Sequence, residues 1–193
     1  MKILLINGSP RRHGNIASML KTIQEELQDS GHHTDMLHIA DLKVSPCTGC
    51  MKCRTAGRCI LPEDDAQRAL KLLAEADAVA VGSPCYWGNM SGQLKLLFDR
   101  MVYGLMRDNP RGLPHPLHKG KRAVILATST TPPPFNILFN QTRGTVRALK
   151  EVLGYSGFRI VGTLQKGGTR TSPALTEREL TRCRRLARKL IKE

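Results

Sequence analysis

Four cysteines in the first third of the chain have a spacing at which proteins bind metal. They follow Pro46 as Cys47, Cys50, Cys53 and Cys59, which gives the pattern C-x2-C-x2-C-x5-C. Three thiolates at this spacing let a short loop surround one iron–sulfur cube, and the fourth closes it, whereas zinc sites more often use two separated C-x2-C pairs. Reduced thiols in such a loop need no metal. The residues therefore favour a cluster and leave zinc and free or redox-active thiols open.

A loop over residues 7–15 carries groups that bind phosphate. It joins a predicted strand to the N-terminus of a predicted helix, where unpaired N–H groups and the helix dipole favour an anion. Ser9 and Asn15 add side-chain donors, and the Arg11 guanidinium adds a charge that pairs well with phosphate. The glycine spacing of G-x-G-x-x-G and the lysine of a P-loop are both missing. We therefore predict an anion-binding loop of another kind.

Two further loops carry aromatic and hydroxyl side chains. Residues 82–90 hold Tyr86 and Trp87, the only tryptophan of the chain, in a loop framed by glycine and proline. Aromatic side chains on a loop can flank a flat heterocycle, while the loop amides reach its polar edge. Residues 127–131 are rich in hydroxyls and follow another predicted strand. Together the three loops suit FMN better than a dinucleotide.

The elements that must position these loops alternate between strand and helix along the whole chain. Apolar runs predict strands over residues 2–6, 34–39, 78–82, 123–127 and about 159–164. Helical periodicity predicts helices over residues 15–29, 64–75, 91–102 and about 142–153. The spacing of Thr176 and Glu179 fits a capping box, so a last helix is predicted after it. This alternation predicts an α/β fold, a doubly wound five-stranded parallel sheet with helices on both faces. Ligands of such sheets bind beyond the carboxyl ends of the strands, where the three loops would meet. We predict one domain over residues 1–193, with a cysteine-rich insertion at about 41–62.

The chain is strongly basic, and its charge is uneven. The net charge is +14, and residues 143–193 hold thirteen cations against four acids. Such a surplus attracts anions, including nucleic acid and acidic membranes, although a solvated helix surface is the commoner reason for it. No apolar run approaches the ~20 residues that span a bilayer, and the apolar start of the chain is too short for a signal peptide. We therefore predict a cytoplasmic protein with no membrane partner and no disulfide framework.

Two motifs of the chain resemble the NADPH-dependent FMN reductase family of the flavodoxin-like superfamily. They are G-S-P-R followed by G-N in residues 8–15, and G-S-P-x-Y-W-G-N-M in residues 82–90. The resemblance implies the flavodoxin-like strand order 2-1-3-4-5, bound FMN, a nicotinamide donor, and a homodimer or homotetramer with active sites near subunit interfaces. The cysteine spacing also resembles the compact motif of iron–sulfur flavoproteins, which share this fold and bind FMN beside a 4Fe-4S cluster.

The resemblance places the FMN contacts on all three loops. The predicted contacts are Ser9, Arg11, His13, Asn15 and Ile16 in the first loop, Ser83, Pro84, Cys85, Tyr86, Trp87, Gly88 and Asn89 in the second, and Thr128 and Ser129 in the third. No side chain is predicted to be catalytic, because the flavin carries the chemistry. Cys47, Cys50, Cys53 and Cys59 are the predicted metal ligands.

The implied activity is that of an FMN-dependent NAD(P)H oxidoreductase. Hydride would pass from NAD(P)H to FMN and on to a quinone, a small electrophile or a protein acceptor. With a cluster, the protein would be an iron–sulfur flavoprotein electron carrier. The alternative is a basic flavodoxin-like binding module that acts on nucleic acid without redox turnover, and we rank it below the oxidoreductase.

Two other groups of side chains receive a structural interpretation. Cys183 shares a helical stripe with Leu186 and Leu190, so it is predicted to lie in the core. His115 and His118 lie in a loop rich in proline and glycine, and we predict that both are solvated.

Overall fold

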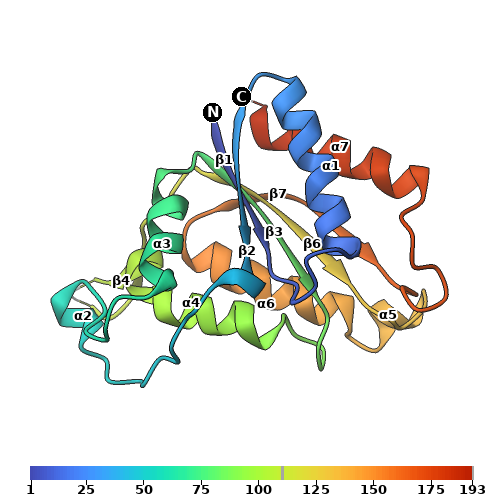
Figure 1. Ribbon diagram of the computed structural model, residues 1–193. Helices are drawn as coiled ribbons and strands as arrows, with labels where there is room; N and C mark the ends of the chain where they lie inside the picture. Colours follow the sequence, from blue (N-terminus) through green and yellow to red (C-terminus); the bar gives the residue numbers. More distant parts are fainter. Residues whose placement is uncertain (110, 193) are drawn as a thin grey trace.

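The computed structural model describes residues 1–109 and 111–192 and has three layers, with a sheet between two sets of helices (Figure 1). The sheet consists of β1 (Lys2–Asn7), β2 (His33–His38), β3 (Ala78–Pro84), β6 (Arg122–Thr128) and β7 (Arg159–Lys166). The strands are parallel, in the order β2-β1-β3-β6-β7. Counted within this sheet the order is 2-1-3-4-5, so the predicted flavodoxin-like fold is confirmed.

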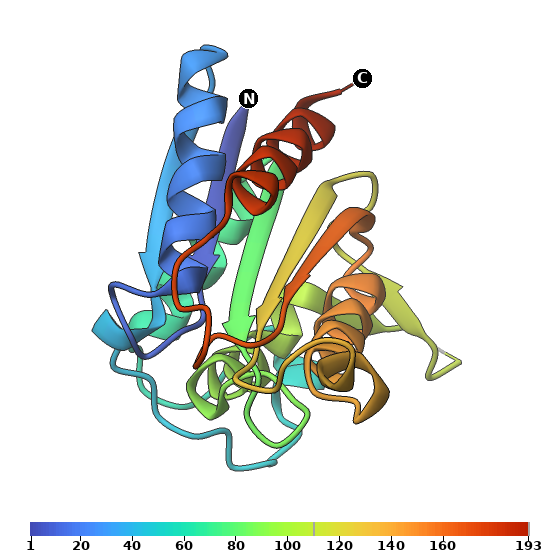
Figure 2. The same ribbon diagram turned by 90° about the vertical axis from the view of Figure 1, so that its right-hand side faces the viewer.

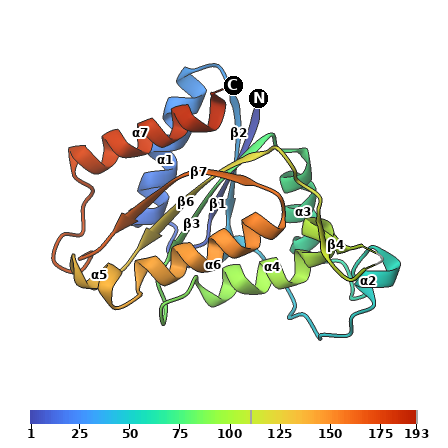
Figure 3. The same ribbon diagram turned by 180° about the vertical axis from the view of Figure 1, so that it is seen from behind.

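Helices cover both faces of the sheet (Figures 1 and 3). One face packs against α1 (Asn15–Asp29) and α7 (Glu177–Ile191), and the other against α3 (Asp65–Glu75), α4 (Gly92–Leu105) and α6 (Thr142–Tyr155). The residues of β1 show why the strand is apolar throughout. Ile3 and Leu5 pack on the α1 and α7 side, whereas Leu4 and Ile6 pack on the other side, because successive side chains of a strand point to opposite faces.

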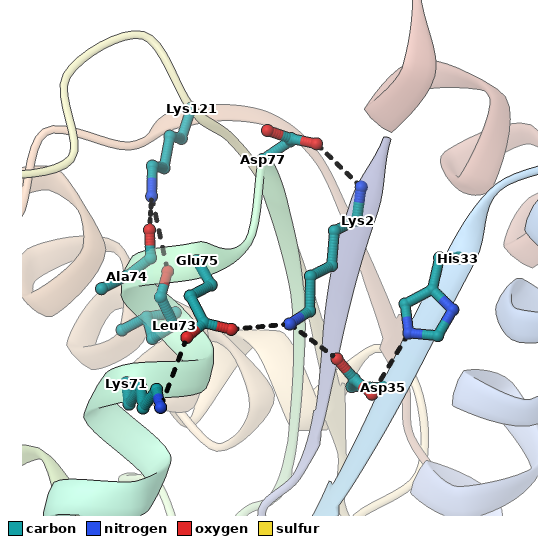
Figure 4. A network of polar contacts seen from close by, with 9 residues as sticks. All are labelled: Lys2, His33, Asp35, Lys71, Leu73, Ala74, Glu75, Asp77 and Lys121. Atoms are coloured by element: carbon teal, nitrogen blue, oxygen red, sulfur yellow. Dashed lines mark hydrogen bonds and ion pairs between the residues drawn. The ribbon is translucent and has the colours of Figure 1, made fainter.

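The amino-terminal edge of the sheet is closed by a polar network (Figure 4). Lys2 lies at its centre: the Nζ atom is 2.8 Å from a carboxylate oxygen of Glu75 and 3.5 Å from one of Asp35, and the backbone N–H donates to Asp77 at 2.7 Å. The hydrogen bond with Glu75 raises the pKa of Lys2 above its ordinary value. These contacts join β1, β2 and the end of α3. At the opposite, carboxyl edge of the sheet, several loops lie close together (Figure 2).

The segment between α4 and β6 contains a hairpin that the sequence did not predict. Strands β4 (Met106–Asp108) and β5 (Pro114–Pro116) pair antiparallel. The Asn109 side chain accepts hydrogen bonds from the backbone N–H groups of Arg111 and Leu113, both at 2.9 Å, and so fixes the turn. Three further short helices, η1 (Ile39–Asp41), α2 (Cys53–Ala56) and α5 (Phe135–Leu138), were also not predicted.

The prediction for the two histidines of this segment is half right. His115 is exposed, but His118 is buried. Its ring stacks on Phe158 with 5.1 Å between ring centroids, and Nε2 hydrogen-bonds the carbonyl of Gly104 at 3.0 Å. Burial lowers the pKa of His118. The proline-rich composition did not predict this role, because the partners of His118 are Gly104 on α4 and Phe158, the residue before β7.

The C-terminal helix agrees with its prediction. Thr176 and Glu179 form the capping box of α7, and Cys183 is fully buried. Burial raises the pKa of the Cys183 thiol to about 12. In the part of the chain that the structure describes, no helix has both the length and the apolar character needed to cross a membrane.

Candidate functional site

A cleft of about 480 Å³ lies at the carboxyl edge of the sheet, and we call it the carboxyl-edge cleft. The loops that follow β1, β3, β6 and β7 form its walls. Nine of the predicted FMN contacts line it, namely Ser9, Arg11, Asn15, Ile16, Pro84, Cys85, Tyr86, Thr128 and Ser129. The fold therefore brings together residues from all three predicted loops.

The first wall ends in an uncapped helix N-terminus. Asn7, at the end of β1, accepts the N–H of Ser9 at 3.0 Å, and the Ser9 hydroxyl accepts the N–H of Arg11 at 3.1 Å. The N-cap of α1 is Gly14, which has no side chain to satisfy the first-turn N–H groups. Gly14 and Asn15 both line the cleft. The positive end of the helix dipole and the exposed Arg11 therefore make this wall attractive to an anion.

The first two walls touch each other through glycine. The N–H of Gly8 donates to the carbonyl of Gly82 at 2.8 Å, and a Cβ atom at Gly8 would lie 2.7 Å from that carbonyl oxygen and 2.5 Å from Leu94 Cδ2. The Ser91 hydroxyl donates to the carbonyl of Gly8 at 2.6 Å, and its N–H donates to the Ser83 hydroxyl at 2.9 Å. Ser83 is fully buried and does not line the cleft, so it holds the second loop in place.

The aromatic loop places its two rings differently. Tyr86 lines the cleft, whereas Trp87 projects from the tip of the turn and is fully exposed, at 102% of its reference area. Tyr86 and Asn89 exchange backbone hydrogen bonds of 2.9 and 3.0 Å. The two residues between them, Trp87 and Gly88, have φ of 54° and 70°, as in a type I′ turn. A bulky side chain at positive φ is uncommon and often marks a functional position.

Some predicted contacts lie outside the cleft in this chain. His13 is exposed on the first loop, and the structure places neither it nor Trp87, Gly88 or Asn89 among the lining residues. The carbonyl of Asn89 instead accepts the hydroxyl of Thr145 on α6 at 3.0 Å. The second loop is thus anchored on the α6 side of the sheet.

The fourth wall of the cleft was missed by sequence reasoning. It follows β7 and contributes Thr169, Pro173, Ala174, Leu175 and Leu180. The rule that ligands bind where the strand order reverses directs attention to the central strands, whereas β7 is the edge strand. The cluster of threonine, glycine, serine and proline in residues 167–176 was the available signal.

A buried ion pair holds this fourth wall. The Nζ atom of Lys166, at the end of β7, lies 3.1 and 3.2 Å from the two carboxylate oxygens of Glu179 on α7, and Lys166 is only 4% exposed. Burial acts to raise the pKa of Glu179, but hydrogen bonds from Thr176 and Lys166 outweigh it and hold that pKa below its ordinary value. The pair fixes α7 to the sheet, and with it the loop between them.

A second cavity, of about 200 Å³, is lined by Cys47, Cys50, Cys53 and Cys59 together with residues of α4 and β4. We call it the cysteine cavity, and residues 46–61 the cysteine loop. All four thiols are free. Burial raises the pKa of Cys53, and the charges of the other three thiols add to that rise. Conversely, the backbone N–H of Lys52 lowers the pKa of Cys50.

The four thiols share a cavity without forming a ready single-ion site. Within residues 1–109 and 111–192, no three His, Cys, Asp or Glu side chains are placed to hold one metal ion. The cysteine cavity and the carboxyl-edge cleft have no lining residue in common. The chain therefore carries two separate candidate sites.

Comparison with known proteins finds relatives that are named iron-sulfur flavoproteins. An iron-sulfur flavoprotein from Archaeoglobus fulgidus is 41% identical over 105 residues, which is 54% of this chain and 47% of that protein. One from Methanocaldococcus jannaschii is 39% identical over 100 residues, 52% of this chain and 51% of that protein. The chain thus spans about half the length of the curated relatives it matches.

A solved structure shares the fold over the whole chain. The NAD(P)H:quinone oxidoreductase from Methanothermobacter marburgensis superposes with a TM-score of 0.73 at 21% identity, over 100% of this chain and 97% of its own. The model of one protein family, described as NADPH-dependent FMN reductase, matches residues 1–165. This match includes the loops after β1, β3 and β6 that line the carboxyl-edge cleft, and the chain belongs to the NADPH-dependent FMN reductase family.

Proposed function

We propose that the protein is an FMN-dependent NAD(P)H oxidoreductase and that its FMN binds in the carboxyl-edge cleft. One observation carries the proposal: the uncapped N-terminus of α1 meets Ser9, Arg11 and Asn15 on the wall of this cleft. The volume of about 480 Å³ lies within the range of roughly 300–1,000 Å³ of small-molecule sites.

The residues of the cleft would divide the work of binding. The Arg11 guanidinium and the first-turn N–H groups of α1 suit a phosphate. Pro84 and Tyr86 offer flat apolar surface for a ring, and the hydroxyls of Thr128 and Ser129 offer hydrogen bonds to a polar ring edge. When bound, FMN supplies the capacity to accept a hydride and to release electrons to an acceptor. The chain's own part is to orient the ring and exclude water from it.

The cysteine cavity is proposed to hold a 4Fe-4S cluster, with Cys47, Cys50, Cys53 and Cys59 as ligands. Four thiols around one cavity match the donor set of such a cluster. The buried Nε–H of Arg100, a cavity residue, has no acceptor among the described residues and suits an anionic group nearby. Zinc or free thiols are the other outcomes of the test. A cluster would supply one-electron transfer.

The remaining parts of the proposal concern partners. The acceptor is a quinone, a small electrophile or a protein, and the working form is a homodimer or homotetramer. The acceptor class rests on the family and on the names of relatives, and the oligomeric state rests on the family. A cytoplasmic location is proposed as well.

The visible spectrum of anaerobically purified protein, before and after NADPH, tests both sites. Flavin bands that bleach with NADPH support the oxidoreductase. A broad shoulder at about 400 nm with matching iron and sulfide supports the cluster, and flavin bands without iron contradict it. A colourless protein that also fails to take up added FMN overturns the central proposal.

The nucleic-acid alternative retains one observation of its own. Six basic side chains are exposed along α7, namely Arg178, Arg182, Arg184, Arg185, Arg188 and Lys189, and Glu26 on α1 pairs with one of them, Arg188. Binding of a duplex by this surface would weaken steeply with salt. If the protein does not bind a nucleic-acid duplex even at low salt, this alternative is wrong.

A further inference from the structure

Arg100 on α4 is buried to an extent that arginine seldom reaches. It is 2% exposed, and its side chain alone is 0% exposed. A charge is costly to bury unless it is paired and hydrogen-bonded. The partners of Arg100 are therefore informative, and none of them lies on the sheet.

The partners lie at the two ends of the cysteine loop. Nη1 of Arg100 donates to the carbonyl of Ser45 at 2.8 Å and to Oδ2 of Asp64 at 2.8 Å. Nη2 donates to the carbonyl of Pro62 at 3.4 Å. Ser45 precedes the loop and Pro62 follows it, so one planar guanidinium joins both ends.

Asp64 completes this connection from the other side. Its Oδ2 atom also accepts the N–H of Ser45 at 2.9 Å, while Oδ1 accepts the N–H of Ala66 and caps α3. Burial opposes ionisation of Asp64, but the two N–H groups and the Arg100 charge hold its pKa below the ordinary value. Lys43 and Asp65 add a pair of hydrogen bonds of 2.8 and 3.2 Å beside it.

Inside the cysteine loop, the contacts are local. Among the described residues, its internal hydrogen bonds join positions at most four apart, as between Gly57 and Cys53. The ion pair between Arg54 and Asp108 reaches outside the loop, but Arg54 is 58% exposed in it, and such a pair contributes little. The shape of the loop thus depends on how its ends are held.

The geometry points to Arg100 as the positioning residue of the cysteine cavity. By joining Ser45, Pro62 and Asp64, it closes the loop so that four cysteines face one cavity, whose wall it also forms. Its Nε–H remains as a donor toward an anionic occupant. The identity of that occupant rests on the proposed cluster, whereas the closure of the loop does not.

The test compares Arg100→Met and Arg100→Lys with a control on the same helix. Gln93→Met changes an exposed side chain that lines neither the cysteine cavity nor the carboxyl-edge cleft. All variants are prepared with bound FMN. Amide hydrogen exchange is measured at Ser45 and Ala66 in metal-free protein, and iron and sulfide are measured after anaerobic reconstitution.

We expect Arg100→Met to speed exchange at these amides and to lower iron content, each by at least about tenfold, because it leaves Asp64 without its charge partner. FMN occupancy and the Gln93→Met control should match wild type. Wild-type exchange at Ser45 in Arg100→Met would overturn the inference. If that variant does not fold, Arg100→Lys decides, since an ammonium keeps the charge but lacks the fork that spans three partners. A wild-type protein that takes up no iron refutes only the proposed cluster. Amide hydrogen exchange then still tests whether Arg100 closes the cysteine loop.

Discussion

The carboxyl-edge cleft and the cysteine cavity differ in what holds their walls. Three walls of the cleft are short loops whose strands are fixed in register within the sheet, as β3 is with β6 from Ala78 to Pro84. The cysteine loop leaves the sheet after β2, and its two ends are joined by the side chain of Arg100. Strand pairing therefore fixes most of the cleft, whereas side-chain contacts fix the ends of the cysteine loop.

The fourth wall of the cleft is the exception, because a side-chain pair holds it. Lys166→Met leaves the Glu179 carboxylate without its ammonium partner beneath the loop. Because Glu179 is 19% exposed in this pair, we expect the lower end of the cost of breaking a buried pair, about 3 kcal/mol of unfolding free energy. Urea denaturation measures this loss. A loss under about 1 kcal/mol would mean that the sheet alone holds α7.

Substitution of Gly8 tests the contact between the loops that follow β1 and β3. In Gly8→Ala the new Cβ meets the backbone carbonyl of Gly82, which cannot rotate away as a side chain can. We expect a loss of about 1–3 kcal/mol in unfolding free energy, with weaker FMN binding. The control is Gly154→Ala on α6, where a Cβ meets no atom within 4 Å. Equal stability of both variants would show that the first two loops can separate freely.

Arg11 separates binding from folding in the cleft. Its side chain is exposed, so Arg11→Ala should leave unfolding free energy within about 0.5 kcal/mol of wild type. Loss of a charge-assisted hydrogen bond of about 1.5–3 kcal/mol should weaken FMN binding by roughly 10- to 100-fold. Flavin fluorescence titration gives the dissociation constant. Arg12→Ala is the matched control, since Arg12 pairs with Asp41 outside the cleft, and equal effects would remove Arg11 from the site.

Low pH should weaken the ion pair of Asp64 with Arg100, which helps to close the cysteine loop. The pKa of Asp64 lies below its ordinary value of 3.8, so its contribution is complete above that value and is lost as pH falls through the lower, folded-state pKa. Stability of the wild type should therefore drop below about pH 4. Asp64→Asn should lack this part of the drop, and Asp29→Asn, at an exposed position of α1, should retain it. Parallel curves for all three proteins would contradict the role of Asp64.

The smallest effect is expected at Trp87. Because the ring is fully exposed and lies outside the cleft of its own chain, Trp87→Ala should change unfolding free energy by no more than about 0.5 kcal/mol. Tyr86→Ala, which removes a lining residue, should weaken FMN binding measurably. If Trp87→Ala weakens FMN binding more than Tyr86→Ala in a chain shown to be monomeric, the placement of the two rings is wrong.

The same contrast explains what the sequence could predict. Helical periodicity from Asn15 to Asp29 and the apolar run of β1 depend on local pattern, so these elements were predicted correctly. The strand order, which is also correct, came from the family resemblance. Arg100 gave no signal, because a charged residue within a helix reads as solvent-exposed. Its burial depends on Ser45 and Asp64, which only the folded chain brings together.

The missed parts of the candidate site have the same origin. Thr169 and Leu175 reach the cleft because the edge strand β7 ends there, and only the composition of residues 167–176 marks that loop. Trp87, Gly88 and Asn89 remain predicted contacts. Their motif was recognised, and the turn with two positive φ angles leaves them outside the lining of the cleft in this chain.

The position of Trp87 also gives the molecule an intrinsic optical probe. Trp87 is the only tryptophan in the chain, so ultraviolet emission excited at the red edge comes from one indole at one known place. A fully hydrated indole emits at long wavelength, and burial by a second subunit or a protein acceptor would move that emission toward the blue. Association at the tip of the aromatic loop can thus be followed in unlabelled protein, at the rim of the cleft where the flavin is proposed to bind.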